Sequence, residues 1–134
     1  MERGKLIDEE LSGSVIGAFY EVYGELGFGF LEHVYIAALE RELIGRGHSV
    51  GREVGVTVFY KGDHLCYQRI DILVDGRLII EVKSSAQLPK TALRQLYNYL
   101  RATDLEIGLL LHFGEEPKFY RKILTNDLKH RSDQ

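Results

Sequence analysis

The segment RIDILVDGRLIIEVKSS, residues 69–85, decides the fold prediction. Its two apolar runs flank the pair Asp75-Gly76, which is typical of a tight turn between antiparallel strands. Three charged residues interrupt the apolar runs, namely Asp71, Glu81 and Lys83. A charge inside a strand costs free energy unless it is paired or binds a ligand. The first question is therefore whether these charges share one face of the hairpin.

The hydrophobic pattern selects the register of this hairpin. A two-residue turn would mix apolar and charged residues on both faces, whereas a three-residue turn separates them. In the second register one face is uniformly apolar and consists of Ile70, Ile72, Val74, Leu78, Ile80 and Val82. The other face carries Asp71, Leu73, Ile79, Glu81 and Lys83. A type I turn with a bulge and a left-handed Gly76 would supply this register, so we expect the three charges to converge.

The rest of the chain predicts one mixed domain. Apolar residues at helical spacing predict helices over residues 8–24, 31–46 and 89–102. Alternating or continuous apolar runs predict strands over residues 49–60, 65–74, 77–83 and 106–113, with 118–124 as a candidate edge strand. We expect an α/β (α+β) fold, with a mixed four-stranded sheet flanked by helices. The single domain would span residues 1–134, with a core over 8–123 and a frayed polar tail over 125–134.

Composition narrows the class of protein. The chain has 134 residues, a net charge of −3 and a single cysteine, Cys66. One cysteine excludes an internal disulfide framework, and we expect a reducing, cytoplasmic location. The charged N-terminus lacks an apolar signal core and no apolar run reaches membrane-spanning length, so no membrane association is expected.

Two interpretations of the charged cluster stay open at the level of spacing. Carboxylates on one face are the ligands that Mg²⁺ and Mn²⁺ prefer, and a neighbouring lysine can act on the attacking water or stabilise developing charge. The alternative is a structural network of ion pairs between the two carboxylates and the lysine. Spacing alone favours the ion-pair network.

The segment resembles the signature of a known superfamily. Asp71, a short hairpin and then Glu81-Val82-Lys83 is similar to the D…(D/E)xK element of the PD-(D/E)XK nucleases, although Ile70 stands where many members carry proline. The αβββαβ order resembles their restriction-endonuclease-like core. Residues 29–35, GFLEHVY, resemble the name motif of the GxxExxY family within that superfamily. The resemblance covers about residues 8–123.

The resemblance implies a metal-dependent nuclease. Asp71, Glu81 and the backbone carbonyl of Val82 would hold Mg²⁺ or Mn²⁺, and Glu32 would support the metal directly or through water. Lys83 would act on the attacking water. Substrate contacts would come from the following helix, through Gln95 and Tyr99 of a QxxxY element and through Arg94. The substrate would be nucleic acid, DNA rather than RNA, and a homodimer is consistent with small nucleases of this architecture.

A second class of function stays open beside the nuclease. The acidic net charge and the small size also suit a catalytically inactive module that binds nucleic acid or protein on the same scaffold. Retained binding without cleavage would separate the two.

Overall fold

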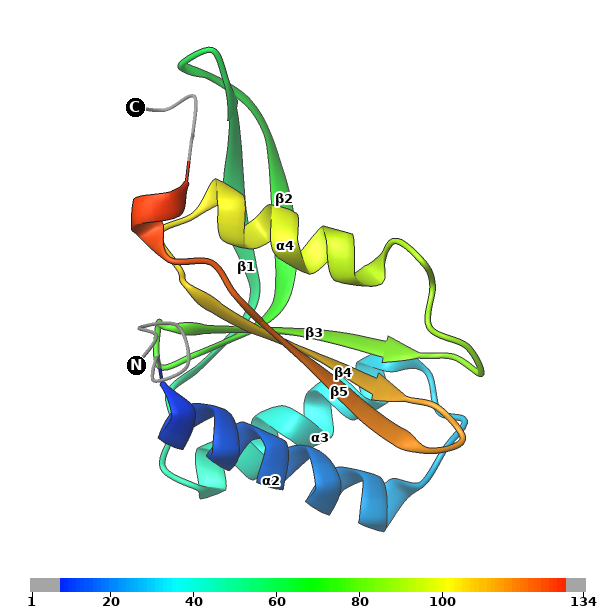
Figure 1. Ribbon diagram of the computed structural model, residues 1–134. Coiled ribbons are helices and arrows are strands. Elements are labelled where there is room, and N and C mark those ends of the chain that lie inside the picture. Colours follow the sequence, from blue (N-terminus) through cyan, green and yellow to red (C-terminus); the bar gives the residue numbers. More distant parts are fainter. Residues whose placement is uncertain (1–7, 130–134) are drawn as a thin grey trace.

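A five-stranded sheet forms the middle layer of the protein, and helices cover both of its faces (Figure 1). The computed structural model describes residues 8–129. Helices α2 (Glu9–Leu26) and α3 (Glu32–Gly45) lie on one face, and α4 (Ala92–Ala102) lies on the other. The strands are β1 (Val50–Tyr60), β2 (Asp63–Val74), β3 (Leu78–Ser84), β4 (Ile107–Phe113) and β5 (Pro117–Ile123), followed by the short 3₁₀ helix η1 (Asn126–Leu128). No helix within residues 8–129 has the length and apolar character needed to cross a membrane.

The sheet confirms the mixed α+β class and corrects the number of strands from four to five. The strands follow the order β1-β2-β3-β4-β5, and all neighbours are antiparallel except β3 and β4, which are parallel. The fifth strand exists because residues 117–123 pair with β4 along its whole length, from Ile107–Ile123 to Phe113–Pro117. That pairing covers the edge of a strand that is completely buried.

Two apolar layers hold the helices to the sheet. The α2/α3 layer includes Phe19, Tyr35, Leu39, Ile72, Val74, Leu78, Ile80, Val82, Leu109 and Phe113. The α4 layer includes Val56, Ile70, Ile79, Leu96, Tyr99, Leu100 and Leu110. In the first layer the ring of Tyr35 stacks on Phe113 with centroids 3.9 Å apart. In the second layer α4 approaches β4 so closely that a Cβ on Gly108 would lie 2.6 Å from Leu96 Cδ1.

The β2–β3 hairpin has the predicted three-residue register. Val74 pairs with Leu78 and Ile72 pairs with Ile80. The turn differs from the type I expectation because Asp75 (φ 53°) and Gly76 (φ 65°) are both left-handed, as in a type I′ turn. Aspartate tolerates this conformation better than most residues. The Ser49 backbone N–H also donates to Asp75 Oδ1 at 2.8 Å and helps to hold the turn.

Ile70 departs from the predicted face. The sequence pattern places it with Ile72 in the apolar face, whereas the structure packs it in the α4 layer with Ile79. The paired residues of β2 and β3 end at Ile72, and from there β2 follows β1 alone. In the pairing of β1 with β2, Glu53, whose φ is 51°, has no paired residue. The expected alternation therefore fails where β2 leaves β3.

The described part of the tail is folded rather than frayed. Thr125 is buried, and Lys129 Nζ donates to the backbone carbonyls of Thr103 at 2.8 Å and Leu105 at 2.6 Å. These contacts fix residues 125–129 against the end of α4. The remaining part of the predicted tail, residues 130–134, lies outside the described residues.

The β1–β2 hairpin forms a ribbon that extends beyond α4 (Figure 1). Every residue from 61 to 69 is exposed. The ribbon therefore presents large side chains to solvent, including Tyr60, Leu65 and Tyr67.

Candidate functional site

The candidate site lies where β2 and β3 separate. Asp71 Oδ2 accepts a hydrogen bond from the backbone N–H of Val82 at 2.8 Å. In return, the backbone N–H of Asp71 donates to Glu81 Oε1 at 3.3 Å. Each carboxylate thus binds the other strand just past Ile72–Ile80, the last backbone pair of β2 and β3 in this direction. These two hydrogen bonds therefore hold the Asp71 and Glu81 side chains together at the point where β2 and β3 separate.

Burial and mutual repulsion dominate the electrostatics of this carboxylate pair. Glu81 is 3% exposed, and burial, reinforced by the charge of Asp71, raises its pKa to about 8. Burial also raises the pKa of Asp71, opposed by its hydrogen bond from Val82. Both carboxylates can therefore be ionised at neutral pH only at a cost, and a bound cation would remove that cost.

Lys83 stands two residues after Glu81 on the same strand. Its charge lowers the pKa of both Asp71 and Glu81, so it is close enough to act on them electrostatically. Among residues 8–129, however, no ion pair within 4.0 Å joins Lys83 to either carboxylate. The ion-pair network that spacing favours is therefore not what the described residues form.

Glu32 lies at the rim of the site, at the first residue of α3. Its Oε2 accepts a hydrogen bond from the backbone N–H of Ser84 at 3.5 Å, and the Ser84 hydroxyl donates to the carbonyl of Phe30. These contacts fix the start of α3 to the end of β3. The charge of Glu32 contributes to the raised pKa of both Asp71 and Glu81, so three carboxylates act on one another here.

Two further residues lie near the site, and the site predicted from the sequence does not include them. Glu53 adds to the raised pKa of Asp71 from the neighbouring strand. Its exposed, left-handed position has no sequence signal, because it depends on how β1 pairs with β2. His112 pairs with Lys83 across β3 and β4, and its Nε2 donates to the Ser85 carbonyl at 2.8 Å. Its Nδ1 is buried without a hydrogen-bond partner among the described residues.

The residues predicted on α4 occupy different positions relative to the carboxylates. Gln95 Nε2 donates to the Tyr99 hydroxyl at 2.9 Å, and that hydroxyl donates to the Arg69 carbonyl at 3.4 Å. Tyr99 is buried, and burial followed by the charge of Glu81 raises its pKa. Arg94 is exposed and lies over the ring of Tyr97, 5.1 Å from its centroid. The phenol thus lies near the carboxylates, whereas the guanidinium faces outward.

The donor set of the site fits a hard divalent cation. After the two backbone hydrogen bonds, Asp71 and Glu81 each keep one carboxylate oxygen with no hydrogen-bond partner among residues 8–129. Mg²⁺ needs only one or two carboxylates because it retains several waters. Over the same residues, no three histidine, cysteine, aspartate or glutamate side chains form a ready metal cluster, so Glu32 does not complete one. Zinc would call for histidine or thiolate ligands, which the site does not offer.

Comparison with known proteins agrees with this geometry. The family model described as "PD-(D/E)XK nuclease superfamily" matches residues 9–131. The fold is also similar to the crystal structure of SSO0001, with a TM-score of 0.52 and 19% sequence identity. That similarity covers 92% of this chain and 60% of the other, so the chain spans less than two thirds of that structure. No curated protein matches, and the narrower GxxExxY placement stays a prediction. Because the family model covers nearly the whole chain, this protein belongs to the PD-(D/E)XK nuclease superfamily.

Proposed function

We propose that this protein is a nuclease that hydrolyses phosphodiester bonds of nucleic acid with Mg²⁺ or Mn²⁺. The observation that carries the proposal is the pair Asp71 and Glu81, two buried or half-buried carboxylates fixed side by side without a cationic partner in contact. A divalent cation would neutralise this pair. Membership in the superfamily points to the same chemistry.

Each residue of the site has a role in this proposal. Asp71, Glu81 and the backbone carbonyl of Val82 would hold the cation, which would supply an activated water and stabilise charge on the phosphate. Lys83 orients the attacking water and stabilises the charge that develops on the phosphoryl oxygens. Glu32 would support the cation from the rim of the site.

In this proposal Tyr99 and Gln95 act beside the carboxylates, whereas Arg94 acts from the outer face of α4. Tyr99 is buried, so we assign it and Gln95 to positioning: their hydrogen bond fixes the phenol beside Glu81. Arg94 is exposed and is free to meet a phosphate of the substrate from the outer face of α4.

The β1–β2 ribbon supports nucleic acid as the substrate. It presents Tyr60 and Tyr67 together with Lys61 and Arg69, all exposed. Aromatic rings stack on bases, and cationic side chains contact phosphates. DNA is the expected substrate over RNA, and the protein is expected to act in the cytoplasm, with a homodimer as its working form.

Cleavage and metal binding are best tested together. Purified protein is incubated with single- and double-stranded DNA and RNA in Mn²⁺, in Mg²⁺ and in EDTA, and Mn²⁺ binding is measured by calorimetry. We expect metal-dependent cleavage by the wild type and none by Glu81→Gln, which should also bind Mn²⁺ more weakly. Lys83→Ala should keep Mn²⁺ binding and lose cleavage by about 100-fold or more. Lys90→Ala, an exposed lysine outside the site, is the matched control.

A single result refutes the proposal: no cleavage of any of the four substrates together with no detectable Mn²⁺ binding. Size-exclusion chromatography of the same preparation tests the homodimer. Cleavage of RNA in preference to DNA would leave the chemistry in place and overturn the expected substrate.

A second candidate is a catalytically inactive module that binds nucleic acid. The absence of a three-ligand metal cluster within residues 8–129 favours it, as does the exposed ribbon. In that case binding of DNA would be retained by Lys83→Ala and Glu81→Gln, the wild type would not cleave, and Tyr67→Ala would weaken binding. Loss of cleavage with retained binding in Lys83→Ala supports the nuclease instead.

A further inference from the structure

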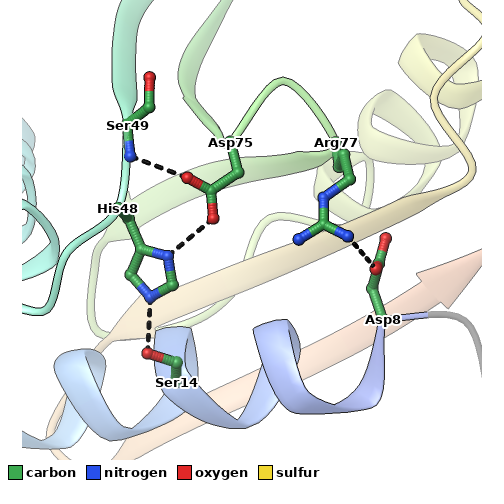
Figure 2. A network of polar contacts seen from close by, with 6 residues as sticks. All are labelled: Asp8, Ser14, His48, Ser49, Asp75 and Arg77. Carbon is green, nitrogen blue, oxygen red and sulfur yellow. Dashed lines mark hydrogen bonds and ion pairs between the residues drawn. The ribbon is translucent and has the colours of Figure 1, made fainter.

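A second polar site lies at the other end of β3, away from Lys83. Its residues come from four segments: Ser14 from α2, His48 from the connection after α3, Asp75 from the β2–β3 turn and Arg46 from the end of α3. They line an open hollow of about 430 Å³. Figure 2 shows Ser14, His48 and Asp75 in a continuous chain of hydrogen bonds.

The chain has the order of a nucleophile, a base and an orienting acid. Ser14 Oγ lies 2.7 Å from His48 Nε2, and His48 Nδ1 lies 2.8 Å from Asp75 Oδ2. Hydrogen-bond distance between a hydroxyl and an imidazole that a carboxylate orients in turn is the geometric condition for an activated serine. The imidazole is mostly covered, with 14% of its side chain exposed, while Ser14 borders the hollow.

The surroundings of Asp75 fix which imidazole nitrogen carries the proton. The backbone N–H of Ser49 donates to Asp75 Oδ1 at 2.8 Å, and this bond, followed by the one to His48, lowers the pKa of Asp75. An ionised carboxylate can only accept hydrogen bonds, so His48 Nδ1 must be the donor to it. In the neutral ring Nε2 is then the acceptor, and it faces the Ser14 hydroxyl.

The backbone holds this base in place. Helix α3 ends in a Schellman motif, in which Gly47 (φ 92°) donates to the Ile44 carbonyl at 2.9 Å and His48 donates to the Leu43 carbonyl at 3.1 Å. The backbone of His48 is therefore fixed directly after the end of α3, which restrains the position of the imidazole. Asp75 is equally restrained, since its N–H donates to the Ser49 carbonyl at 2.8 Å.

Arg46 supplies positive charge to the hollow that Ser14 borders. Its guanidinium lies against α2 at Gly17, where an added Cβ would be 2.9 Å from Nη1. Gly17 follows Ser14 by three residues and so lies on nearly the same side of α2. The Arg46 Nε is held by Glu42 at 3.0 Å. The backbone N–H groups around Ser14 belong to the helix, so a side chain must stabilise any oxyanion here.

Other charges limit what the hollow accepts. Arg77 lies in the same hollow but pairs with Asp8 at 2.8 Å (Figure 2). Glu10 and Asp75 add negative charge, and Leu11 contributes apolar surface. A strongly anionic ligand would meet these carboxylates, whereas a small, uncharged ester would not.

We propose that Ser14, His48 and Asp75 form a second reactive site that takes an acyl group from small, uncharged carboxylic esters. The Ser14 oxygen attacks the acyl carbon while its proton moves to His48 Nε2, and Arg46 stabilises the resulting oxyanion. The bond from the acyl carbon to the ester oxygen breaks, and the alcohol leaves with the proton from His48. Water then releases the acid by the same steps, which restores the serine.

Labelling of the whole protein with an alkyl fluorophosphonate tests this proposal. Attack by Ser14 on phosphorus expels fluoride and leaves a covalent adduct, which peptide mapping by mass spectrometry locates. We expect one adduct, on Ser14, and turnover of p-nitrophenyl acetate that stops after labelling. His48→Ala should slow labelling by about 100-fold or more, as expected for loss of a general base. Gly17→Ala should slow it by about tenfold or more, because the new methyl group displaces Arg46 from α2.

Matched variants separate this site from general reactivity and from the nuclease. Ser49→Ala removes a neighbouring exposed serine that contacts Asp75 only through its backbone N–H and carbonyl, and labelling should be unchanged. Glu81→Gln, which disables the proposed metal site, should also label normally. A wild type that carries no adduct on Ser14 overturns the proposal. So does an adduct that forms equally fast in a His48→Ala protein whose circular dichroism spectrum is native.

Discussion

Replacement of Glu81 by glutamine tests the electrostatic account of the carboxylate pair. The side chain is 3% exposed, and burial together with Asp71 raises its pKa from 4.5 to about 8. The unfolded chain loses this proton near pH 4.5, whereas the folded protein keeps it up to about pH 8. The folded state therefore binds more protons across this window, so the free energy of unfolding falls as the pH rises through it.

The size of this fall in the free energy of unfolding follows from the pKa of Glu81 in the folded protein and in the unfolded chain. Each tenfold change in an ionisation constant is worth about 1.4 kcal/mol. The full change at Glu81 therefore amounts to roughly 5 kcal/mol, of which about 3 to 4 kcal/mol develops between pH 5 and pH 8. Glutamine removes the titration, and its amide oxygen can still accept the Asp71 N–H. Relative to wild type, metal-free Glu81→Gln should gain roughly 3 to 4 kcal/mol in free energy of unfolding over this range.

Urea denaturation in EDTA at intervals from pH 5 to pH 9 measures this difference by linear extrapolation. Glu25→Gln, which removes one negative charge from an exposed position of α2, is the control. The reasoning is wrong if the wild-type and Glu81→Gln profiles run parallel across the window. Mn²⁺ provides an independent check, because it should stabilise the wild type more at pH 8 than at pH 5 and stabilise Glu81→Gln little.

Three further substitutions probe packing and backbone geometry by thermal denaturation. Gly108→Ala should destabilise the protein by about 1 to 3 kcal/mol, because the new Cβ would lie 2.6 Å from Leu96 Cδ1. Tyr35→Phe should cost about 1 to 3 kcal/mol, since the buried hydroxyl satisfies two backbone groups of the loop ahead of α3. Gly76→Ala should cost about 1 kcal/mol, because φ is 65°. No steric clash adds to this cost, since nothing lies within 4 Å of the new methyl group. An unchanged melting temperature in any of the three would contradict the corresponding contact or dihedral.

The periodic parts of the chain could be predicted because their patterns report local structure. The register of the β2–β3 hairpin followed from keeping one face apolar, and the pairs Val74–Leu78 and Ile72–Ile80 confirm it. The same alternation failed at Ile70, because a pattern cannot indicate where one strand leaves its neighbour. The fifth strand was only a candidate, since its mixed burial gives a weak signal and its stability comes from β4.

The candidate site, too, could be predicted only in part from the sequence. Convergence of Asp71 and Glu81 was predictable from the register of the hairpin. The two hydrogen bonds that fix these side chains were not predictable, because they form where the backbone pairing of β2 with β3 has stopped, and a sequence does not show where pairing stops. The proximity of Glu53 depends on pairing with β1. Ser14, His48 and Asp75 lie far apart in the chain and carry no shared motif, so only the folded structure brings them together.

The order of the strands has a consequence for how the protein folds. Strands β1, β2 and β3 are joined by tight turns, as are β4 and β5, so each group closes only short loops. The parallel pairing of β3 with β4 must instead wait for the segment that contains α4, and closing that longer loop costs more chain entropy. Asp71 and Glu81 both belong to the first group, so their repulsion opposes a step that comes early. Protons or divalent cations should therefore act chiefly on the rate of folding and much less on the rate of unfolding.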